Sequence, residues 1–249
     1  MTSVCAVIPV YDHEHAVGQM VQSLRQQGLT VFLVDDGSGP PCAAELDRLA
    51  DGNVDANVRL LRLPKNQGKG AAVMAGFAAA ASAGFSHALQ IDADGQHDPM
   101  DVPRFVAAAH ADPQSLVCGR PVFDSSIPRH RFYFRYLTHA MVWLNTLSFD
   151  IPDSMCGLRV YPLPVVLPLL AAEPMGQRMD FDTEVLVRLY WRHTRMQWLP
   201  TRVRYPLDGV SHFHLVRDNW LITRMHTRLF FGMLRRSPRL LVRKLSVTA

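Results

Sequence analysis

Three carboxylates follow an apolar run in the segment Leu89–Asp98, which reads LQIDADGQHD. Like charges this close repel and raise one another's pKa unless a cation or several hydrogen-bond donors offset them. Mg²⁺ and Mn²⁺ prefer carboxylate oxygens, and one or two Asp side chains plus a diphosphate can complete their coordination shell. Asp92 and Asp94 are two residues apart and share one side of an extended chain, whereas Asp98 fits a helix cap. The segment therefore predicts a divalent-cation site at Asp92 and Asp94.

The elements that must position these acids can be outlined from the order of apolar and helical stretches. Strand-like runs alternate with stretches of helical periodicity, and this order predicts right-handed β-α-β units. Such units build a mostly parallel central sheet flanked by helices, which is an α/β fold. The expected strands are residues 4–10, 30–35, 58–63, 87–92, 115–119 and 196–205, and the expected helices are residues 14–27, 43–50 and 70–83.

Polar residues follow three of the first four expected strands. These strand ends read Pro9-Val-Tyr-Asp12, Asp35-Asp-Gly-Ser38 and Asp92-Ala-Asp-Gly-Gln96. In an open α/β sheet, ligands bind outside the carboxyl ends of the strands, so the three segments should meet at one rim. Each segment alone also fits an ordinary turn or helix cap, and only their combination indicates a site.

The segment Lys65-Asn-Gln-Gly-Lys-Gly70 opens the expected helix at residues 70–83. Free backbone N–H groups near a helix N-terminus favour anions, so this segment is a candidate anion site. It lacks the P-loop pattern, and the first strand is not followed by the glycine fingerprint of dinucleotide-binding folds. A nicotinamide-dependent oxidoreductase is therefore disfavoured.

Length and composition bound the class of protein. With 249 residues, of which 48% are hydrophobic, the chain is long enough for one α/β domain with a large core, which we expect at residues 1–214. The four cysteines are scattered without a C-x-x-C pair, and this favours reduced thiols. No signal peptide or membrane span is indicated, so we expect a cytoplasmic protein, with contact at the inner face of the membrane left open.

The segment at residues 215–249 differs from the rest in charge. From Arg217 onward it contains eight Arg and Lys residues and one Asp, although the whole chain has a net charge of only +4. A basic amphipathic helix suits anionic lipid headgroups, but it can equally pack on the domain with a solvated basic face. No basic patch with interleaved aromatic residues is present, so nucleic acid is not an expected partner. The apolar residues near one helical face are Trp220, Leu221, Met225, Leu229 and Met233.

In order and spacing, these motifs resemble those of the family 2 glycosyltransferases, which have the GT-A nucleotide-sugar-binding fold. The nearest likeness is to the branch containing dolichol- and polyprenyl-phosphate sugar synthases, and it covers residues 4–205. At position 12 the family often reads Tyr-Asn-Glu, where this chain has Tyr11-Asp-His-Glu14, so UDP and GDP both remain open. The matching segments are Val7-Ile-Pro-Val-Tyr11, Val34-Asp-Asp-Gly-Ser38, Asn66-Gln-Gly-Lys-Gly70 and Ile91-Asp-Ala-Asp-Gly-Gln-His97 and, less sharply, Cys118-Gly-Arg120, Asp153-Ser-Met-Cys-Gly-Leu-Arg-Val-Tyr161 and Phe181-Asp-Thr-Glu184.

The resemblance implies roles for the matching residues. The departing diphosphate would be stabilised by a Mn²⁺ or Mg²⁺ ion and by arginines. The residues implied for the nucleotide sugar are Pro9, Val10, Tyr11, Asp35, Asp36, Lys69, Asp92, Ala93 and Asp94. Those implied for the metal are Asp92, Asp94 and Gln96, with His212 or His214 as an additional ligand from the segment at 209–214. The candidate arginines are Arg120 and Arg131, preferred over Arg129 and Arg159.

The acceptor decides whether a catalytic base is needed. A phosphate acceptor is already anionic, whereas a hydroxyl acceptor needs a carboxylate within hydrogen-bond reach. Asp182 and Glu184 are the candidate bases, with Asp182 preferred, while Asp153 and Asp180 stay open. Each of these acids also fits a helix N-terminus, where a negative charge complements the helix dipole.

The predicted function is metal-assisted, inverting transfer of a sugar from a UDP- or GDP-sugar to a lipid-linked or otherwise membrane-associated acceptor. The acceptor oxygen would attack the anomeric carbon opposite the departing diphosphate. Two alternatives stay open, namely the same chemistry on a soluble acceptor and nucleotide-sugar binding without turnover. The sugar itself is not specified, because substrate choice depends on loops that vary on a common fold.

Overall fold

The computed structural model describes residues 2–123, 129–203 and 214–247, with side chains described outside 129–134 and 243–247. Its strands are β1 (Val4–Val10), β2 (Val31–Asp35), β3 (Val58–Arg62), β4 (His87–Gln90), β5 (Leu116–Phe123), β6 (Arg159–Pro162) and β7 (Met196–Val203). Its helices are α1 (Glu14–Gln26), α2 (Pro40–Leu49), α3 (Lys69–Ser82), α4 (Val102–Ala111), α5 (Arg129–Thr146), α6 (Leu163–Ala172), α7 (Phe181–Trp191) and α8 (Leu215–Val247), and the short 3-10 helix η1 (Pro99–Asp101) precedes α4.

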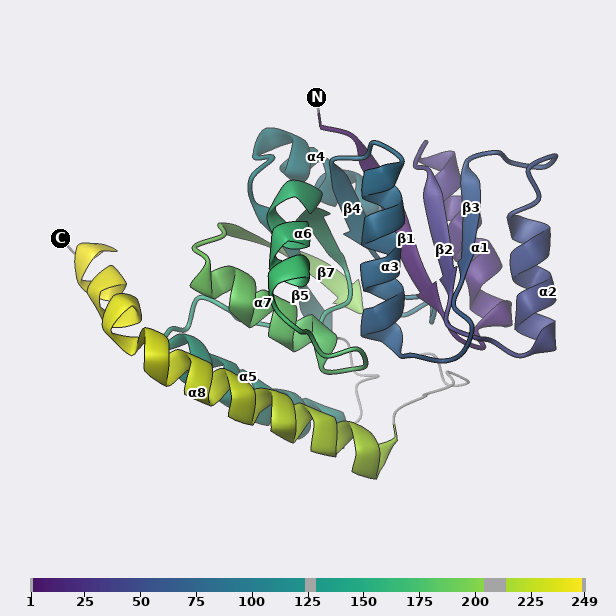
Figure 1. Ribbon diagram of the computed structural model, residues 1–249. Coiled ribbons are helices and arrows are strands. Elements are labelled where there is room, and N and C mark those ends of the chain that lie inside the picture. The colour runs from purple at the N-terminus through teal and green to yellow at the C-terminus, as the bar shows by residue number, and fades with distance from the viewer. Residues whose placement is uncertain (1, 124–128, 204–213, 248–249) are drawn as a thin grey trace.

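The described strands form one seven-stranded sheet in the order β3-β2-β1-β4-β6-β5-β7, with helices on both faces (Figure 1). Among the described strands, only β6 runs antiparallel to its neighbours, β4 and β5. The prediction of a mostly parallel sheet flanked by helices is therefore confirmed. The carboxyl ends of β1, β2 and β4 lie at the lower side of the sheet in Figure 1, where α8 crosses the molecule.

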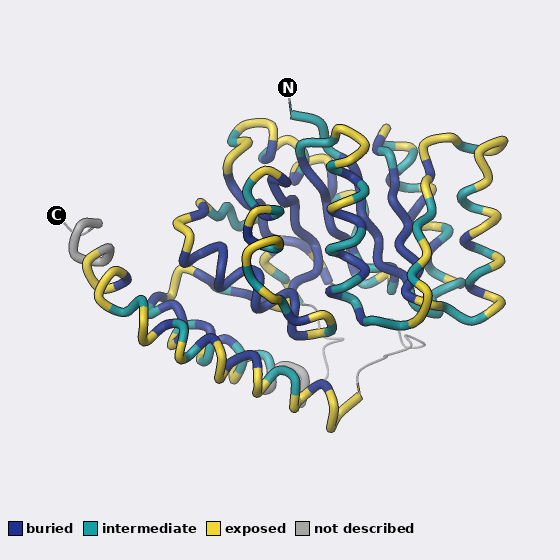
Figure 2. The backbone as a smooth tube through the Cα atoms, in the orientation of Figure 1, coloured by how far each residue is buried: buried dark blue, intermediate teal, exposed yellow. Residues whose placement is uncertain are grey.

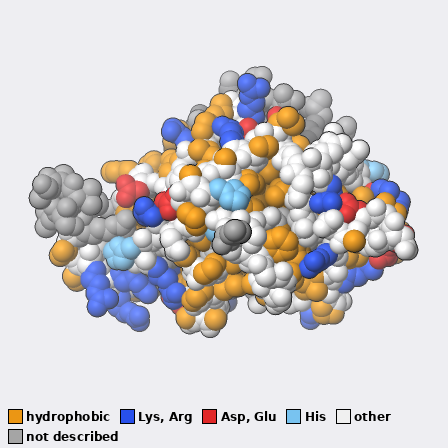
Figure 3. Space-filling view, turned by 90° about the horizontal axis from the view of Figure 1, so that it is seen from above, with side chains coloured by type: hydrophobic (Ala, Val, Ile, Leu, Met, Phe, Trp, Pro, Cys, Tyr) orange, Lys and Arg blue, Asp and Glu red, His pale blue; other side chains and the backbone are white. Residues whose placement is uncertain are grey.

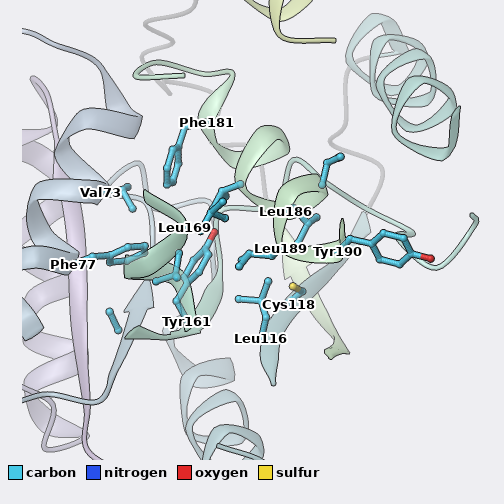
Figure 4. Packing of buried hydrophobic residues seen from close by; sticks show 14 of the residues in the cluster. Val73, Phe77, Leu116, Cys118, Tyr161, Leu169, Phe181, Leu186, Leu189 and Tyr190 are labelled. Carbon is cyan, nitrogen blue, oxygen red and sulfur yellow. The ribbon is translucent and has the colours of Figure 1, made fainter. Parts of the chain in front are cut away.

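The core has two layers because successive side chains of a strand point to opposite faces of the sheet. In β1, Val7 packs in the cluster that contains Phe77 of α3, whereas Ile8 packs in the cluster that contains Val17 of α1. Figure 2 shows the strands as the buried centre, and Figure 4 shows the first cluster around Phe77 and Tyr161. Burial on both faces explains the near-continuous apolar runs of β1 and β2. The four cysteines are free, and all four are buried.

Helix α8 lies beside α5 and packs against α5 and α7 (Figure 1). Met225, Leu229 and Met233, which the sequence places on one apolar face, are buried in this contact. Trp220 was expected on the same face but is 65% exposed. Of the two alternatives for this helix, packing on the domain therefore applies to the side of α8 that carries Met225, Leu229 and Met233. Among the helices that the structure describes, none combines the length and apolar character needed to cross a bilayer.

Candidate active site

A cavity of about 430 Å³ lies at the carboxyl ends of β1, β2 and β4, where the sequence predicts a site. Eight of the nine residues proposed for the nucleotide sugar line it, and Asp35 is the exception. The predicted residues on its walls are Pro9, Val10, Tyr11, Asp36, Lys69, Asp92, Ala93 and Asp94. The remaining lining residues are His13, Asn66, Gly68, Arg178, Met179 and, from the start of α8, His214, Arg217 and Asp218.

Asp36 connects the end of β2 to the segment that precedes α3. Its Oδ1 accepts the backbone N–H of Gln67 and its Oδ2 accepts that of Gly68, both at 2.7 Å. Burial raises the pKa of Asp36, although these two bonds oppose the shift. Gly68 has a φ of +107°, and a Cβ there would lie 2.4 Å from Cγ of Arg178. Because Asp36 already uses these N–H groups, the predicted anion site presents the side chains of Asn66 and Lys69 to the pocket instead.

Lys69 lies between two carboxylates at the floor of the pocket. Its Nζ is 2.7 Å from Oδ1 of Asp92 and 2.7 Å from Oδ2 of Asp182. Burial alone would lower the pKa of Lys69, but the charges of Asp182 and Asp92 raise it above its usual range. Burial alone would raise the pKa of Asp182, but Lys69 and Arg159 outweigh burial and lower it. The side chains of Lys69 and Asp182 are therefore both charged at neutral pH.

The acids after β4 fit the binding of a divalent ion together with a ligand diphosphate. The pKa of Asp94 is raised, first by burial and then by the neighbouring charge of Asp92. Lys69 is shared between Asp92 and Asp182, and Asp94 forms no ion pair with a described cation, so a divalent ion would offset the negative charge of Asp92 and Asp94. Within the described residues, no three His, Cys, Asp or Glu side chains are grouped as a complete metal site. Phosphate oxygens and waters would supply the remaining ligands, as is usual for Mg²⁺.

Two of the other proposed metal ligands lie away from this arrangement or outside the described chain. Gln96 donates its backbone N–H to Oδ1 of Asp94 at 3.0 Å, and it is not among the residues that line the cavity. His212 lies outside the described residues. His214, the alternative histidine, lines the cavity from the residue before α8.

The two acids proposed as bases are both buried, in different surroundings. Asp182 lies beneath Lys69, where its Oδ1 accepts a hydrogen bond of 2.8 Å from Nε2 of Gln90. Glu184 is fully buried and accepts bonds from the backbone N–H of Gly176 and from Nε of Arg188, at 2.8 and 2.9 Å. A third donor, Nε of Arg228 in α8, lies 3.0 Å from Glu184. Neither acid is among the described residues that line the donor cavity.

The arginines proposed to stabilise the diphosphate are not brought together by the described structure. Arg120 is exposed on β5 and does not line the cavity. Arg129 and Arg131 lie in the first turn of α5, but their side chains are outside the described part. Asp35, proposed for the nucleotide, instead accepts Nε of Arg62 at 3.0 Å behind the pocket.

Residues 153–159, which end at the first residue of β6, pack against Asp92 and Asp182. Arg159 is fully buried and donates to the backbone oxygens of Ser154 and Asp182, at 2.7 and 2.6 Å. Asp153 accepts Nε and Nη2 of Arg135, and its pKa is well below the usual range because the charges and bonds of its partners outweigh burial. A Cβ at Gly157 would lie 2.2 Å from Oδ2 of Asp92. This element therefore positions Asp92 and Asp182 and leaves Arg159 no route to a ligand.

Several lining residues were not found from the sequence. Arg178 donates Nη1 to Oδ1 of Asn66 at 2.8 Å and forms one wall of the cavity. The available signal was an arginine just before the acidic start of α7, together with the glycine at position 68 that leaves room for it. Asp218 and Arg217 are brought to the pocket by the packing of α8, and Asp218 caps α8 by accepting the N–H of His214 at 2.7 Å. No local pattern predicts that long-range contact.

A mostly parallel sheet with carboxylates gathered at the ends of β1, β2 and β4 is the arrangement of a ligand-binding α/β protein. Residues 5–166 match the model of the family described as Glycosyl transferase family 2, and the chain belongs to this family.

Two curated relatives share part of the chain. A dolichyl-phosphate beta-glucosyltransferase of Dictyostelium discoideum is 28% identical over 63% of this chain and 49% of that protein. An undecaprenyl-phosphate 4-deoxy-4-formamido-L-arabinose transferase of Pseudomonas fluorescens is 30% identical over 77% of this chain and 55% of that protein. The chain thus spans about half the length of these relatives.

Among solved structures, the glucosyl-3-phosphoglycerate synthase of Mycobacterium tuberculosis, in complex with Mn²⁺ and UDP-glucose, aligns with a TM-score of 0.68. It covers 93% of this chain and 79% of its own length, at 13% identity. At 13% identity this likeness establishes the GT-A fold alone. The Mn²⁺ ion and UDP-glucose are ligands of that synthase.

Proposed function

We propose that the protein transfers a sugar from a UDP- or GDP-sugar to the phosphate of a membrane-associated polyprenyl lipid. The observation that carries this proposal is the pocket itself, in which Asp36 lies beside the end of β1, and Asp92 and Asp94 follow β4. The names of the two curated relatives, which include dolichyl phosphate and undecaprenyl phosphate, support the choice of acceptor.

Different residues of the pocket would contact the nucleoside, the metal ion and the phosphates of the donor. Pro9, Val10 and Tyr11 form the wall at the end of β1, where the nucleoside would lie beside Asp36. Asp92 and Asp94 would hold a Mn²⁺ or Mg²⁺ ion, which would stabilise the negative charge of the departing diphosphate. The cationic side chains of Arg178 and Arg217 face the same cavity and can contact phosphate oxygens. These two arginines replace Arg120 as the described candidates for that role.

The reaction would be a direct displacement. An acceptor oxygen forms a bond to the anomeric carbon on the face opposite the diphosphate, and the bond to the diphosphate breaks with its electron pair leaving on the diphosphate oxygen. The configuration at the anomeric carbon is thereby inverted. A phosphate acceptor at neutral pH is already an anionic nucleophile and requires no proton transfer.

The surroundings of Asp182 favour a phosphate over a hydroxyl acceptor. A general base works best with a pKa near the working pH, but Lys69 lowers the pKa of Asp182. We infer that Asp182 is a positioning residue for Lys69 and that Glu184 stabilises the packing of α7 with α8. Asp153 and Asp180 are likewise held by protein donors, the former by Arg135 and the latter by the N–H of Arg178.

We also propose that α8 contacts the membrane surface through its outward face. Trp220 and Phe231 are 65% and 62% exposed there, and Leu234 and Val242 are exposed on the same helix. Arginines accompany these apolar side chains along α8, and Figure 3 shows Lys and Arg side chains gathered at the end of the molecule toward which α8 runs. Exposed aromatic residues beside cations suit an interface with anionic lipid.

Calorimetric titration of UDP and GDP, each with and without Mn²⁺, tests the donor site directly. Binding of one nucleoside diphosphate only in the presence of Mn²⁺ is the expected result. Absence of binding under all four conditions would refute the donor assignment. Release of nucleoside diphosphate from the matching sugar nucleotide when polyprenyl phosphate is added then separates transfer from binding without turnover.

A further inference from the structure

A second cavity, of about 660 Å³, opens beside the donor pocket, between residues 65–67, residues 175–180 and α8. Asn66 and Arg178 line both cavities, so the two are neighbours. The first turn of α8 borders the donor pocket, and its residues 221–228 border the second cavity. We call this second cavity the basic groove, because it is lined by Lys65, Arg178, Arg224 and Arg228 and by one acid, Asp180.

Two of the four cations are fixed in place by the protein. Arg228 is held by the buried carboxylate of Glu184 through an Nε–Oε1 bond of 3.0 Å. Arg178 donates Nη1 to the neutral side-chain oxygen of Asn66 at 2.8 Å, and Asp36, on which its charge acts, lines the donor pocket and not the groove. Both guanidinium groups are therefore positioned before any ligand arrives, which reduces the entropy lost on binding.

The other two cations have no acidic partner in the described part of the chain. Neither Lys65 nor Arg224 forms an ion pair with a described acid, and both are exposed. Arg224 lies four residues before Arg228 on α8, a spacing at which like charges repel on one helical face. Asp180 accepts the backbone N–H of Arg178, and burial raises its pKa although the charge of Arg228 opposes the shift. The groove thus keeps a clear excess of positive charge.

We propose that the basic groove is a phosphate-binding subsite separate from the donor pocket. Guanidinium groups bind phosphate through paired, charge-assisted hydrogen bonds, and two fixed arginines with two exposed cations match a phosphate monoester or diphosphate. The donor pocket, by contrast, carries Asp92 and Asp94, for which we propose a metal ion, beside Lys69, Arg178 and Arg217. Because four cations and a single acid line the groove, phosphate binding there should not depend on a metal ion. The phosphate subsite itself is argued from the groove. The further step, that its ligand is the phosphate of the acceptor, rests on the proposed function.

Isothermal titration with inorganic pyrophosphate in the presence of EDTA tests the subsite, because the donor pocket is then without metal. Arg224→Gln and Lys65→Gln remove one charge each from opposite walls, and Arg239→Gln removes one charge from an exposed position of α8 outside the groove. We expect Arg224→Gln and Lys65→Gln to weaken pyrophosphate binding by about tenfold or more, since a hydrogen bond to a charged group contributes on that scale. Equal affinity of all three variants and the parent chain would overturn the proposal.

UDP titration with Mn²⁺ on the same variants separates this proposal from the proposed function. Unchanged UDP binding with weakened pyrophosphate binding supports the groove, whereas loss of both together would overturn its separateness. Failure of the parent chain to bind UDP or GDP while pyrophosphate still binds would refute the donor site alone. Flotation with phosphatidylcholine vesicles, with and without phosphatidic acid, identifies the source of the phosphate. If the protein floats only with vesicles that contain phosphatidic acid, and Arg224→Gln abolishes this, the groove binds a lipid phosphate. If Arg224→Gln weakens pyrophosphate binding but does not change flotation, the groove binds a free phosphate.

Discussion

Nζ of Lys69 lies 2.7 Å from Oδ2 of Asp182, and this contact joins the first turn of α3 to the first turn of α7. The same ammonium is 2.7 Å from Oδ1 of Asp92, at the edge of the donor pocket. Gln90 donates to the other oxygen of Asp182, so the carboxylate has partners on both sides. Through Lys69, Asp92, which we propose as part of the donor site, is electrostatically linked to α7.

Replacing Lys69 by Met should destabilise the protein strongly. The change leaves Asp182 buried without its cation, and breaking a buried ion pair in this way costs about 3–5 kcal/mol. The free energy of unfolding in urea at neutral pH measures the loss. Lys69→Arg keeps the charge and should recover part of the stability. A loss below about 1 kcal/mol in Lys69→Met would show that the ion pair is of the weak, solvent-screened kind.

Asp94→Asn should remove the metal dependence of nucleotide binding and leave the fold intact. The change takes away a carboxylate from the pair with Asp92, and the raised pKa of Asp94 indicates that its charge is poorly compensated without a metal. Calorimetry of UDP or GDP with Mn²⁺ should show little or no binding. Asp98→Asn is the matched control, because Asp98 caps η1 through the N–H of Met100 outside the pocket. Equal Mn²⁺-dependent affinity in both variants would contradict the site.

The pocket was largely predictable because its residues follow directly from strand ends. In a parallel sheet, the positions just after Val10, Asp35 and Gln90 must meet at one rim, so Tyr11, Asp36 and Asp92 were found without knowing any contact. The roles of Asp182 and Glu184 were not predictable in the same way. Both acids open α7 within three residues, yet one pairs with Lys69 in α3 and the other with Arg228 in α8.

The strands and helices show the same division between local and long-range information. β1 and α1 were predicted to within a residue, because periodicity and burial agree there. Helices α5 and α6 were not predicted. Pro162 precedes α6, and Pro164 and Pro168 lie within it, and these prolines obscure the helical pattern. The packed face of α8 depends on α5 and α7, which no pattern within α8 identifies.

Asp182→Asn should have a modest effect on transfer to a phosphate acceptor. The amide keeps the shape of the side chain but loses the charge beside Lys69, so we expect the rate at saturating substrate to fall by less than about tenfold. Loss of a true general base costs about 10²–10⁴-fold. Single-turnover rates with polyprenyl phosphate, alongside UDP or GDP affinity, provide the comparison. A fall in the transfer rate of about 10²-fold or more, with unchanged donor affinity, would identify Asp182 as the base and favour a hydroxyl acceptor.

Glu184→Gln should reduce stability without changing donor affinity. Glu184 is fully buried between Arg188 and Arg228, and a neutral amide leaves these guanidinium groups short of negative charge. We expect a loss of about 3 kcal/mol in the free energy of unfolding. Glu173→Gln is the control, since Glu173 pairs with Arg188 and Arg192 at a more exposed position and should cost about 1 kcal/mol or less. Wild-type stability with impaired transfer in Glu184→Gln would instead indicate a catalytic role.

His226 should make the stability of the protein depend on pH between about 6.5 and 4. Its ring is buried between α8 and α5, where Nδ1 lies 3.2 Å from Nδ2 of Asn145, and burial lowers its pKa from 6.5 to about 4. The unfolded chain therefore binds a proton in this range that the folded chain does not, so stability is fully present above pH 6.5 and is lost as the pH falls toward 4. A shift of this size corresponds to about 3 kcal/mol.

Urea unfolding of the parent chain and His226→Gln at pH 7 and pH 5 isolates this contribution. The glutamine retains an acceptor for Asn145 but does not titrate, so the loss of stability between the two pH values should be smaller in the variant by about 1–2 kcal/mol. The comparison cancels the other buried histidines, such as His87, whose pKa is also lowered by burial. An identical pH dependence in both proteins would mean that His226 becomes protonated without opening the α5–α8 contact.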